Sequence, residues 1–213
     1  GLPNVFTAYQ AVTADAAREK FEKAWGVPLP ANVGTVLTEV INKAHHGDIR
    51  ALYVLGENPM MSDPDLEHVE EALKNIDFVV VQDIFLSETA KLADVVLPGA
   101  SFAEKDGTFS NTERRVQRVR KAVSPPGQAR SDWEIICDLA ARMGYPMSYV
   151  NAEEIFEEIR TLTPSYAGIS YQRIEDGGLQ WPCPTETHPG TPFLHKDGNF
   201  SRGAGAFTAI DYI

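Results

Sequence analysis

The chain has 213 residues, of which 43% are hydrophobic and 23% are charged, and its formal net charge at pH 7 is -11. These values are ordinary for a globular protein with one domain, or with one domain and an extension. An acidic chain of this kind disfavours nucleic-acid binding that is driven by charge, because phosphate contacts need a basic surface. We therefore expect no nucleic-acid partner.

Cysteine usage and hydropathy limit the chemistry of the chain further. Cys137 and Cys183 are its two cysteines, with no CxxC pair and no cysteine–histidine cluster at the spacing of metal ligands. We expect no metal-ligating residue, iron–sulfur site or structural zinc site in this chain. No apolar run approaches the roughly 20 residues that span a bilayer, so we also expect no membrane segment. The opening residues lack signal-peptide features and predict a sequence cut from a longer one.

Two helices are expected in the amino-terminal part. The first covers Thr13 to Trp25 and ends at Gly26, and the second is capped by Asn32 and carries an apolar stripe as far as Ala44. The pair His45–His46 follows at the carboxyl end of the second helix. Adjacent helical positions point in different directions, so a solvated helix end is a better interpretation of this pair than a metal site.

The middle of the chain alternates between strands and a helix. The runs Ala51 to Leu55, Phe78 to Val81 and Asp94 to Leu97 have the length and composition of strands. Between the first two, Asp63 and Pro64 are expected to open a helix, whose buried stripe is Leu66, Val69, Leu73 and Ile76. Strand, helix and strand at this spacing form a right-handed parallel crossover. The predicted fold class is α/β, with a Rossmann-like, doubly wound, mostly parallel sheet flanked by helices.

The carboxyl-terminal part changes in character. Residues from Gly107 to Val119 are expected to form an extended arm or hairpin, and Ser131 with Glu134 forms a capping box for a helix through Met143. That helix is expected to bury Trp133, Ile136, Cys137, Ala140 and Met143. Another helix runs from Asn151 to about Leu162, and the residues after it have no period. We predict a dinucleotide-binding-like domain over 1–150, then a helix and an irregular extension over 151–213.

Polar residues follow the predicted strands. Gly56 and Asn58 come after the first strand, and Gln82 and Asp83 end the second. The carboxyl ends of parallel strands share one sheet edge, where α/β proteins bind ligands. A plain turn made by Gly56 and Pro59 is an equally good explanation of the first pair. The sequence has neither GxGxxG after the first strand nor GxxxxGK[ST], which disfavours an ordinary NAD or ATP site.

A basic window follows the third strand. The residues that define it are Lys105, Asp106, Arg114, Arg115, Arg118, Arg120 and Lys121. Such a window suits a pyrophosphate or a buried carboxylate partner. A solvated run of charges is the commoner explanation, and both interpretations stay open from the residues alone.

Several of these segments together resemble a known family. The succession LGENP, VVVQD, ADVVLP, EKDGTFSNTERRVQ, RSDWEII and RMGYP resembles the molybdopterin oxidoreductases of the dimethyl-sulfoxide-reductase superfamily. Within that family, QDIF, RMGYPM and QWPC are most similar to the branch of the formate dehydrogenase alpha subunits. The resemblance extends over nearly the whole chain, which looks like an internal fragment of such a subunit.

The resemblance implies a cofactor and the residues that bind it. Relatives hold molybdenum or tungsten with two molybdopterin guanine dinucleotides, each in a dinucleotide-binding-like domain. The positions that match their cofactor-binding residues are Gly56, Glu57, Asn58, Gln82, Asp83, Lys105 and Asp132. The family's iron–sulfur cysteines and its metal-ligating cysteine or selenocysteine have no counterpart here. We therefore expect no catalytic residue in this chain.

For the intact protein, the resemblance implies oxidation of formate to carbon dioxide, with an iron–sulfur cluster in an amino-terminal part. It further implies the remaining domains of its own chain and electron-transfer subunits as partners, and a cytoplasmic location. The chain alone is expected to be inactive. Two alternatives remain: a non-catalytic nucleotide-binding module, similar in shape to central domains of thiamine-dependent enzymes, and a subunit-interaction module that docks through its acidic face and irregular tail.

Overall fold

The computed structural model describes residues 3–198 and 207–210 of the chain. Two compact units divide these residues: unit 1 holds residues up to Gly107 together with Val119–Phe156, and unit 2 holds Thr108–Arg118 together with residues from Glu157 onward. Each unit is described by itself below. The division into a binding domain over 1–150 and an extension over 151–213 stays a prediction.

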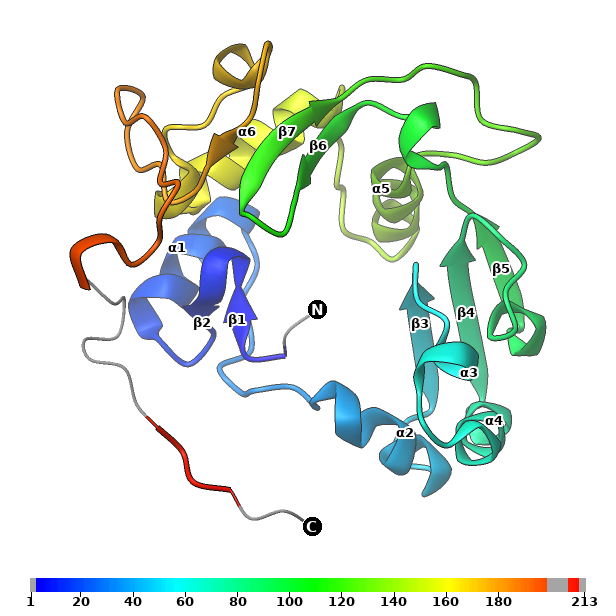
Figure 1. Ribbon diagram of the computed structural model, residues 1–213. Helices are drawn as coiled ribbons and strands as arrows, with labels where there is room; N and C mark the ends of the chain where they lie inside the picture. Colours follow the sequence, from blue (N-terminus) through cyan, green and yellow to red (C-terminus); the bar gives the residue numbers. More distant parts are fainter. Residues whose placement is uncertain (1–2, 199–206, 211–213) are drawn as a thin grey trace. The chain divides into compact units, whose positions relative to one another are not determined.

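Unit 1 contains most of the regular elements (Figure 1). In chain order they are β1 (Val5–Phe6), a 3-10 turn (Thr7–Tyr9), β2 (Gln10–Ala11), α1 (Asp15–Trp25), α2 (Leu37–His45), β3 (Ala51–Leu55), α3 (Pro59–Ser62), α4 (Leu66–Asn75), β4 (Phe78–Asp83), a second 3-10 turn (Ala90–Leu92), β5 (Val95–Pro98), a third 3-10 turn (Phe102–Glu104) and α5 (Asp132–Arg142). Strand β6 (Gly107–Ser110) and helix α6 (Ala152–Leu162) each begin in unit 1 and continue into unit 2.

A three-stranded parallel sheet organises unit 1. Its strand order is β3-β4-β5, and the register pairs Leu55 with Gln82 and Gln82 with Leu97. Figure 1 shows the three arrowheads pointing in one direction, with α5 beyond them and α4 near the other end of the strands. The α/β class with a helix-flanked parallel sheet is confirmed. Hydrophobic runs rich in valine produce these strands because β-branched side chains pack well on a pleated surface.

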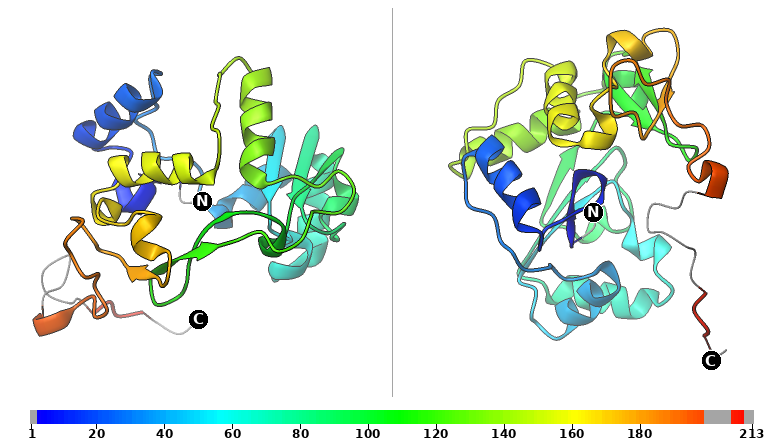
Figure 2. Two further views of the ribbon diagram at one scale, coloured as in Figure 1. Left: turned by 90° about the horizontal axis from the view of Figure 1, so that it is seen from above. Right: turned by 90° about the vertical axis from the view of Figure 1, so that its left-hand side faces the viewer.

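One face of the sheet forms the core of unit 1. Side chains alternate between the two faces of a strand, so Val54, Val79 and Val81 share the face that packs against α2 and α4. Figure 2 shows these helices beside the sheet. The other members of the cluster are Ala44, Val69, Ala72, Leu73, Ile76 and Ala90. The opposite face carries Tyr53 and Gln82, and this face leads to the candidate site.

Two predicted helix starts are wrong. Helix α2 begins at Leu37 after Val36 rather than near Asn32, with the proline-containing segment before it in no regular helix. Helix α4 is capped by Asp65, which accepts a hydrogen bond from the backbone N–H of His68 at 3.1 Å. Asp63 instead ends the short helix α3, so it cannot cap α4. Leu66, predicted to be buried, is 45% exposed because it opens the first turn of α4.

The capping box of α5 is confirmed, but its predicted buried face is not. Ser131 and Glu134 exchange both hydrogen bonds of the box. Ile135 is the buried residue of the helix, whereas Ile136 and Met143 are 38% and 78% exposed. The buried face of α5 therefore includes Ile135 in place of Ile136. Cys137 is half-buried rather than a core residue, and burial raises the pKa of its thiol.

Unit 2 has little regular structure but a compact interior. Strand β7 (Arg115–Val119) pairs antiparallel with β8 (Leu179–Gln180), and the single turns Pro164–Tyr166, Gln172–Ile174 and Lys196–Gly198 are 3-10 helices. Its buried side chains include Val116, Leu162, Ile169, Tyr171, Ile174 and Cys183. The start of α6 agrees with the prediction, because Asn151 Oδ1 accepts the backbone N–H of Glu154 at 3.0 Å.

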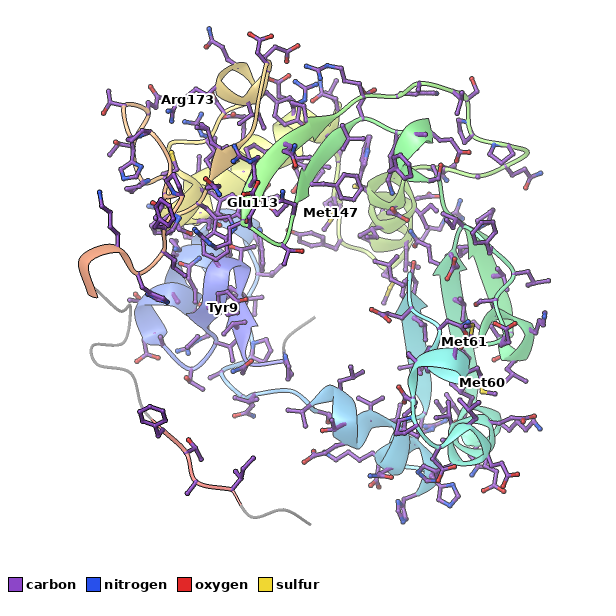
Figure 3. All side chains as sticks on the ribbon, in the orientation of Figure 1. Tyr9, Met60, Met61, Glu113, Met147 and Arg173 are labelled. Carbon is purple, nitrogen blue, oxygen red and sulfur yellow. The ribbon has the colours of Figure 1, made fainter. Side chains whose placement is uncertain are left out.

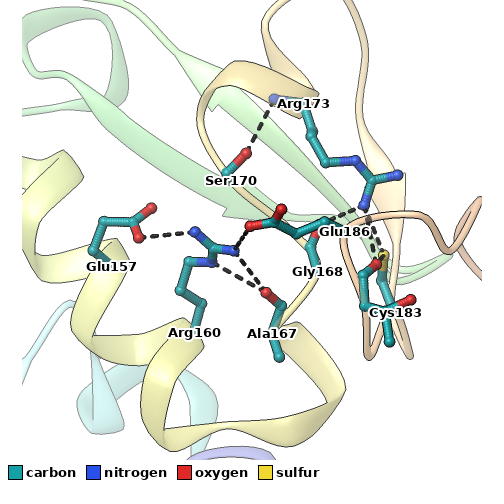
Figure 4. Close-up of polar contacts among 9 residues, drawn as sticks. Glu157, Arg160, Ala167, Gly168, Ser170, Arg173, Cys183 and Glu186 are labelled. Atoms are coloured by element: carbon teal, nitrogen blue, oxygen red, sulfur yellow. Dashed lines mark hydrogen bonds and ion pairs between the residues drawn. The ribbon is translucent and has the colours of Figure 1, made fainter.

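Arginine side chains donate hydrogen bonds to the irregular backbone of unit 2, where few strands pair (Figure 4). Arg160 donates to the carbonyl of Ala167 at 2.8 Å and pairs with Glu157 at 2.9 Å. Arg173 donates to Cys183 Sγ at 3.3 Å. Figure 3 shows Arg173 and Glu113 among the side chains of this unit. Buried irregular backbone needs partners for its carbonyl groups, and guanidinium donors supply them here.

The predicted histidine pair lies beside a third histidine. His45 ends α2 and His46 caps it, with His46 Nδ1 2.6 Å from the carbonyl of Asn42. Helix α4 carries His68, and the centroid of its ring lies 4.7 Å from the ring centroid of His45. Among the described residues, no group of three or more histidine, cysteine or acidic side chains has an arrangement that could hold a metal ion.

Candidate functional site

The carboxyl ends of β3, β4 and β5 meet at one edge of the sheet. Gly56, which follows β3, donates its backbone N–H to the carbonyl of Gln82 at 2.9 Å. Gly99, which follows β5, donates to the carbonyl of Asp83 at 3.0 Å. Three separate stretches of sequence therefore contribute backbone to one edge, as the predicted parallel order requires.

Three of the predicted site residues form one hydrogen-bonded network. Gln82 is 1% exposed, and its Nε2 donates to Oδ1 of Asp132 at 2.7 Å. Lys105 donates to the other carboxylate oxygen of Asp132. Tyr53, for which the sequence predicted no role, donates its hydroxyl hydrogen to Oε1 of Gln82. A buried amide needs partners at both ends, and Tyr53 and Asp132 supply them.

Backbone pairing brings Asp132 to the sheet edge. The backbone N–H of Ala100 donates to the carbonyl of Arg130 at 2.7 Å, and that of Arg130 donates to the carbonyl of Pro98 at 3.1 Å. Helix α5 therefore starts next to the end of β5. A Cβ atom on Gly99 would lie 3.0 Å from Oδ1 of Asp132, closer than side chains normally pack. Glycine at this position permits the approach of the carboxylate.

Asn58 belongs to a second network that ties two loops together. Its Oδ1 accepts hydrogen bonds from the backbone N–H of Thr89 at 3.1 Å and from the Thr89 hydroxyl at 2.7 Å. Its Nδ2 donates to Glu88 at 2.9 Å, and this bond is the main reason why the pKa of Glu88 lies below its usual value. Thr89 also accepts the backbone N–H of Met60, labelled in Figure 3. Asn58 therefore holds the loop after β3 against the loop after β4.

The remaining predicted residues stand at the strand ends. Gly56 has a φ of +61°, a conformation that disfavours other residues, and nothing lies within 4 Å of where its Cβ would be. Glu57 beside it is exposed. Asp83 is half-buried and accepts the backbone N–H of Phe85 at 3.0 Å with one oxygen. These positions leave open surface and carboxylate oxygens at the edge.

The basic window is divided between different tasks. Lys105 has a carboxylate partner in Asp132, which agrees with one of the two interpretations of the window. Arg114, by contrast, donates to the carbonyls of Trp181 and, at 2.9 Å, Thr191, within unit 2. Arg118 pairs with Glu175 at 3.2 Å in the same unit. These two arginines hold the irregular segment of unit 2 and are not a solvated run.

The edge offers carboxylate acceptors and a lysine donor, a set that can hold the N–H groups and hydroxyls of a nucleoside. Ionised carboxylates such as Asp83 and Asp132 only accept hydrogen bonds, and they match the adjacent N–H groups of guanine or the hydroxyls of a ribose. Lys105 supplies a positive charge and donors. Burial and, second, the charge of Asp132 raise the pKa of Tyr53, which keeps its hydroxyl protonated as a donor.

Comparison with known proteins identifies the family. A model of the molybdopterin oxidoreductase family matches residues 3–142, which include β3, β4, β5 and the whole of α5. The chain belongs to this family. The molybdopterin oxidoreductase resemblance stated from the sequence is therefore confirmed, and membership supports a molybdopterin cofactor. The roles of the seven predicted cofactor-binding residues stay predictions.

The relatives of this molybdopterin oxidoreductase chain include formate dehydrogenases. The chain is 53% identical over 214 residues to F420-dependent formate dehydrogenase 1 subunit alpha of Methanococcus maripaludis, which covers 99% of this chain and 31% of that protein. It is 42% identical to formate dehydrogenase H of Escherichia coli, over 100% of this chain and 30% of that protein. The chain thus spans less than a third of the length of these relatives.

A solved structure shares the fold. Acetylene hydratase from Pelobacter acetylenicus matches with a TM-score of 0.56 and 24% identity, over 78% of this chain and 24% of that one. This likeness concerns the fold alone. Within the described residues, no helix combines the length and the apolar character needed to cross a membrane.

Sequence reasoning missed Tyr53, Thr89 and Gly99. Tyr53 stands within an apolar strand, where an aromatic residue is ordinary, and its single distinguishing feature is a hydroxyl group. Thr89 and Gly99 lie in loops whose partners are far away in sequence. None of the three carried a local pattern that points to the site.

Proposed function

We propose that this chain is the part of a molybdenum- or tungsten-dependent formate dehydrogenase alpha subunit that binds one molybdopterin guanine dinucleotide through its guanosine end. The observation that supports this most is the hydrogen-bonded network that joins buried Gln82 to the partly exposed Asp132 and Lys105, at the carboxyl edge of the sheet. The formate part of the proposal rests on identity to formate dehydrogenase subunits.

The residues of the edge have distinct tasks in this proposal. Asp83 and Asp132 accept hydrogen bonds from the nucleoside, and Lys105 balances the charge of Asp132 and offers donors to the ligand. Gly56 and Glu57 line the open side of the first strand end, and Asn58 holds the loops in place through Thr89. Gln82 orients the carboxylate of Asp132 through its side-chain hydrogen bond.

When bound, the cofactor supplies the two-electron chemistry that converts formate to carbon dioxide. This chain binds and orients it and contributes no catalytic residue. The proposal includes an iron–sulfur cluster, the remaining domains of the subunit and electron-transfer subunits as partners, and a cytoplasmic location. Residues 1–150 act in it as a dinucleotide-binding-like domain, and residues 151–213 lead toward a further domain.

Calorimetric titration with GDP tests the site, with ADP and NAD as comparisons. We expect guanine-selective binding at roughly millimolar affinity, about 4 kcal/mol. Asp83→Ala should abolish it, because one end of β4 loses its carboxylate. Asp77→Ala is the matched control, since Asp77 precedes the same strand and pairs with Arg50 at 2.8 Å.

Each outcome has a clear meaning. Equal losses in the two variants would contradict a site at Asp83. A preference for ADP or NAD would favour the non-catalytic nucleotide-binding module. No binding of any nucleotide by the wild-type chain would remove the claim that these strand ends form a site by themselves.

A further inference from the structure

Tyr53 lies on a partly exposed sheet face and bonds to a buried amide. It lies in the middle of β3, on the sheet face opposite the core, and it remains 37% exposed. Its hydroxyl nevertheless bonds to Gln82, which is 1% exposed. One side chain therefore connects open surface to the buried centre of the candidate site.

The directions of the hydrogen bonds in this network follow from the carboxylate of Asp132, where the network ends. An ionised carboxylate accepts but does not donate, so Gln82 must turn its NH2 group toward Asp132. The amide oxygen of Gln82 then points to Tyr53, whose hydroxyl must donate. If the amide were reversed, its oxygen would face the carboxylate oxygen of Asp132 without a hydrogen between them. Asp132 therefore selects the amide orientation, and Tyr53 holds the amide oxygen in place by donating to it.

We propose that Tyr53 is a positioning residue for nucleotide binding: by holding the amide of Gln82, it sets the carboxylate of Asp132 in the orientation that receives a guanosine nucleotide. This proposal rests on the proposed function. It extends that function to Tyr53, which is not one of the seven predicted cofactor-binding residues. Lys105 fixes one carboxylate oxygen and Gln82 the other. Only a fixed carboxylate can offer its remaining lone pairs to a ligand without losing side-chain entropy on binding.

A purely structural role is the competing explanation. Tyr53 would then satisfy a buried amide, and its loss would lower stability without a specific effect on the nucleotide. Tyr145 provides a matched comparison in the same unit, because its hydroxyl donates to the carbonyl of Trp25 at 3.0 Å, in a contact that does not involve the network. Each tyrosine can be changed to phenylalanine with the loss of one hydroxyl hydrogen bond.

The first test compares GDP affinity in the wild-type chain, Tyr53→Phe and Tyr145→Phe. We expect about a tenfold weaker affinity in Tyr53→Phe, equivalent to ~1.4 kcal/mol, and an unchanged affinity in Tyr145→Phe. Near-ultraviolet circular dichroism establishes that both variants are folded. An unchanged affinity in Tyr53→Phe, or equal losses in both variants, would overturn the proposal.

A second test needs no nucleotide and so separates this proposal from the proposed function. Nuclear magnetic resonance can follow hydrogen exchange of the side-chain NH2 group of Gln82. We expect exchange at least about ten times faster in Tyr53→Phe, and the wild-type rate in Tyr145→Phe, because only the former releases the amide. If the wild-type chain binds no GDP, the proposed nucleotide site is wrong. Faster exchange in Tyr53→Phe would still show that Tyr53 positions the amide of Gln82. Unchanged exchange in Tyr53→Phe refutes the inference in either case.

Discussion

Nε2 of Gln82 lies 2.7 Å from Oδ1 of Asp132, although 50 positions separate the two residues. The bond joins the end of a central strand to the first residue of α5. Because Gln82 is almost fully buried, this contact fixes both the start of the helix and the carboxylate that the helix presents. The candidate site is therefore part of the packing of unit 1 and not a loop added to it.

Asp132→Asn should destabilise the chain by about 1 kcal/mol, because Lys105 loses its anionic partner and only one oxygen remains to accept from Lys105 and Gln82, with some of the effect screened by solvent. Urea denaturation measures the change. Asp138→Asn is the control on the same helix: Asp138 pairs with Arg130 at 3.3 Å and Arg142 at 3.2 Å, all well exposed. A smaller effect is expected there. If the control is as damaging as Asp132→Asn, the network has no special role.

The pKa of Tyr53 should be measurably above its usual value of 10.0, first because of burial and second because of the charge of Asp132. Tyrosinate absorbance at alkaline pH, as the difference between wild type and Tyr53→Phe, reports it. Asp132→Asn should lower the pKa only in part, since burial remains. The folded state holds this proton more tightly than the unfolded state, so the stabilising contribution is present below about pH 10 and is lost as pH rises further. A wild-type pKa at or below 10 contradicts the network.

The cap of α4 offers a direct choice between two aspartates. Asp65→Ala should cost about 1 kcal/mol of stability, because the backbone N–H of His68 loses its acceptor. Asp63→Ala should cost less, since Asp63 makes no cap of α4. Urea midpoints of the two variants decide the matter. A larger loss of stability in Asp63→Ala would instead support the helix start that the Asp63–Pro64 pair predicts.

Asn58→Asp should raise the pKa of Glu88, because it replaces the donating amide, the main cause of the low pKa, with a second carboxylate. Carbon-detected titration of the Glu88 carboxyl group measures this. In the wild type, the lowered pKa stabilises the fold above the usual glutamate range, and the effect is lost as pH falls through the folded-state pKa. The variant should lose this acid-range dependence of stability. An unaltered Glu88 titration would show that the Asn58 contact is absent in solution.

The pure chain should not reduce dyes with formate as the donor. None of its described residues forms a group that could hold a metal ion, and the proposed chemistry belongs to the cofactor. A spectrophotometric dye-reduction assay, with a whole formate dehydrogenase as the positive control, checks this. Formate-dependent reduction by the chain alone would refute the assignment of its residues to binding only.

Local patterns in the sequence were sufficient for the elements and the family. The strand Ala51–Leu55 and the capping box of Ser131 and Glu134 were predicted correctly, because strand composition and caps depend on residues a few positions apart. Gln82, Lys105 and Asp132 were grouped by resemblance to relatives; the structure joins them by hydrogen bonds, and their role in cofactor binding stays a prediction. Boundaries were less predictable where two acidic residues competed for one cap, as at Asp63 and Asp65.

Only the tertiary structure decided which side chains meet. The contacts of Tyr53 with Gln82, and of Asn58 with Thr89, join strands and loops that the parallel register places side by side. Nor did helical periodicity alone show that Ile135 rather than Ile136 is buried, since a shift of one position depends on how α5 lies in its surroundings. Hydrogen bonds and packing between distant segments depend on register and approach, and these arise from the sum of many contacts rather than from any short stretch of residues.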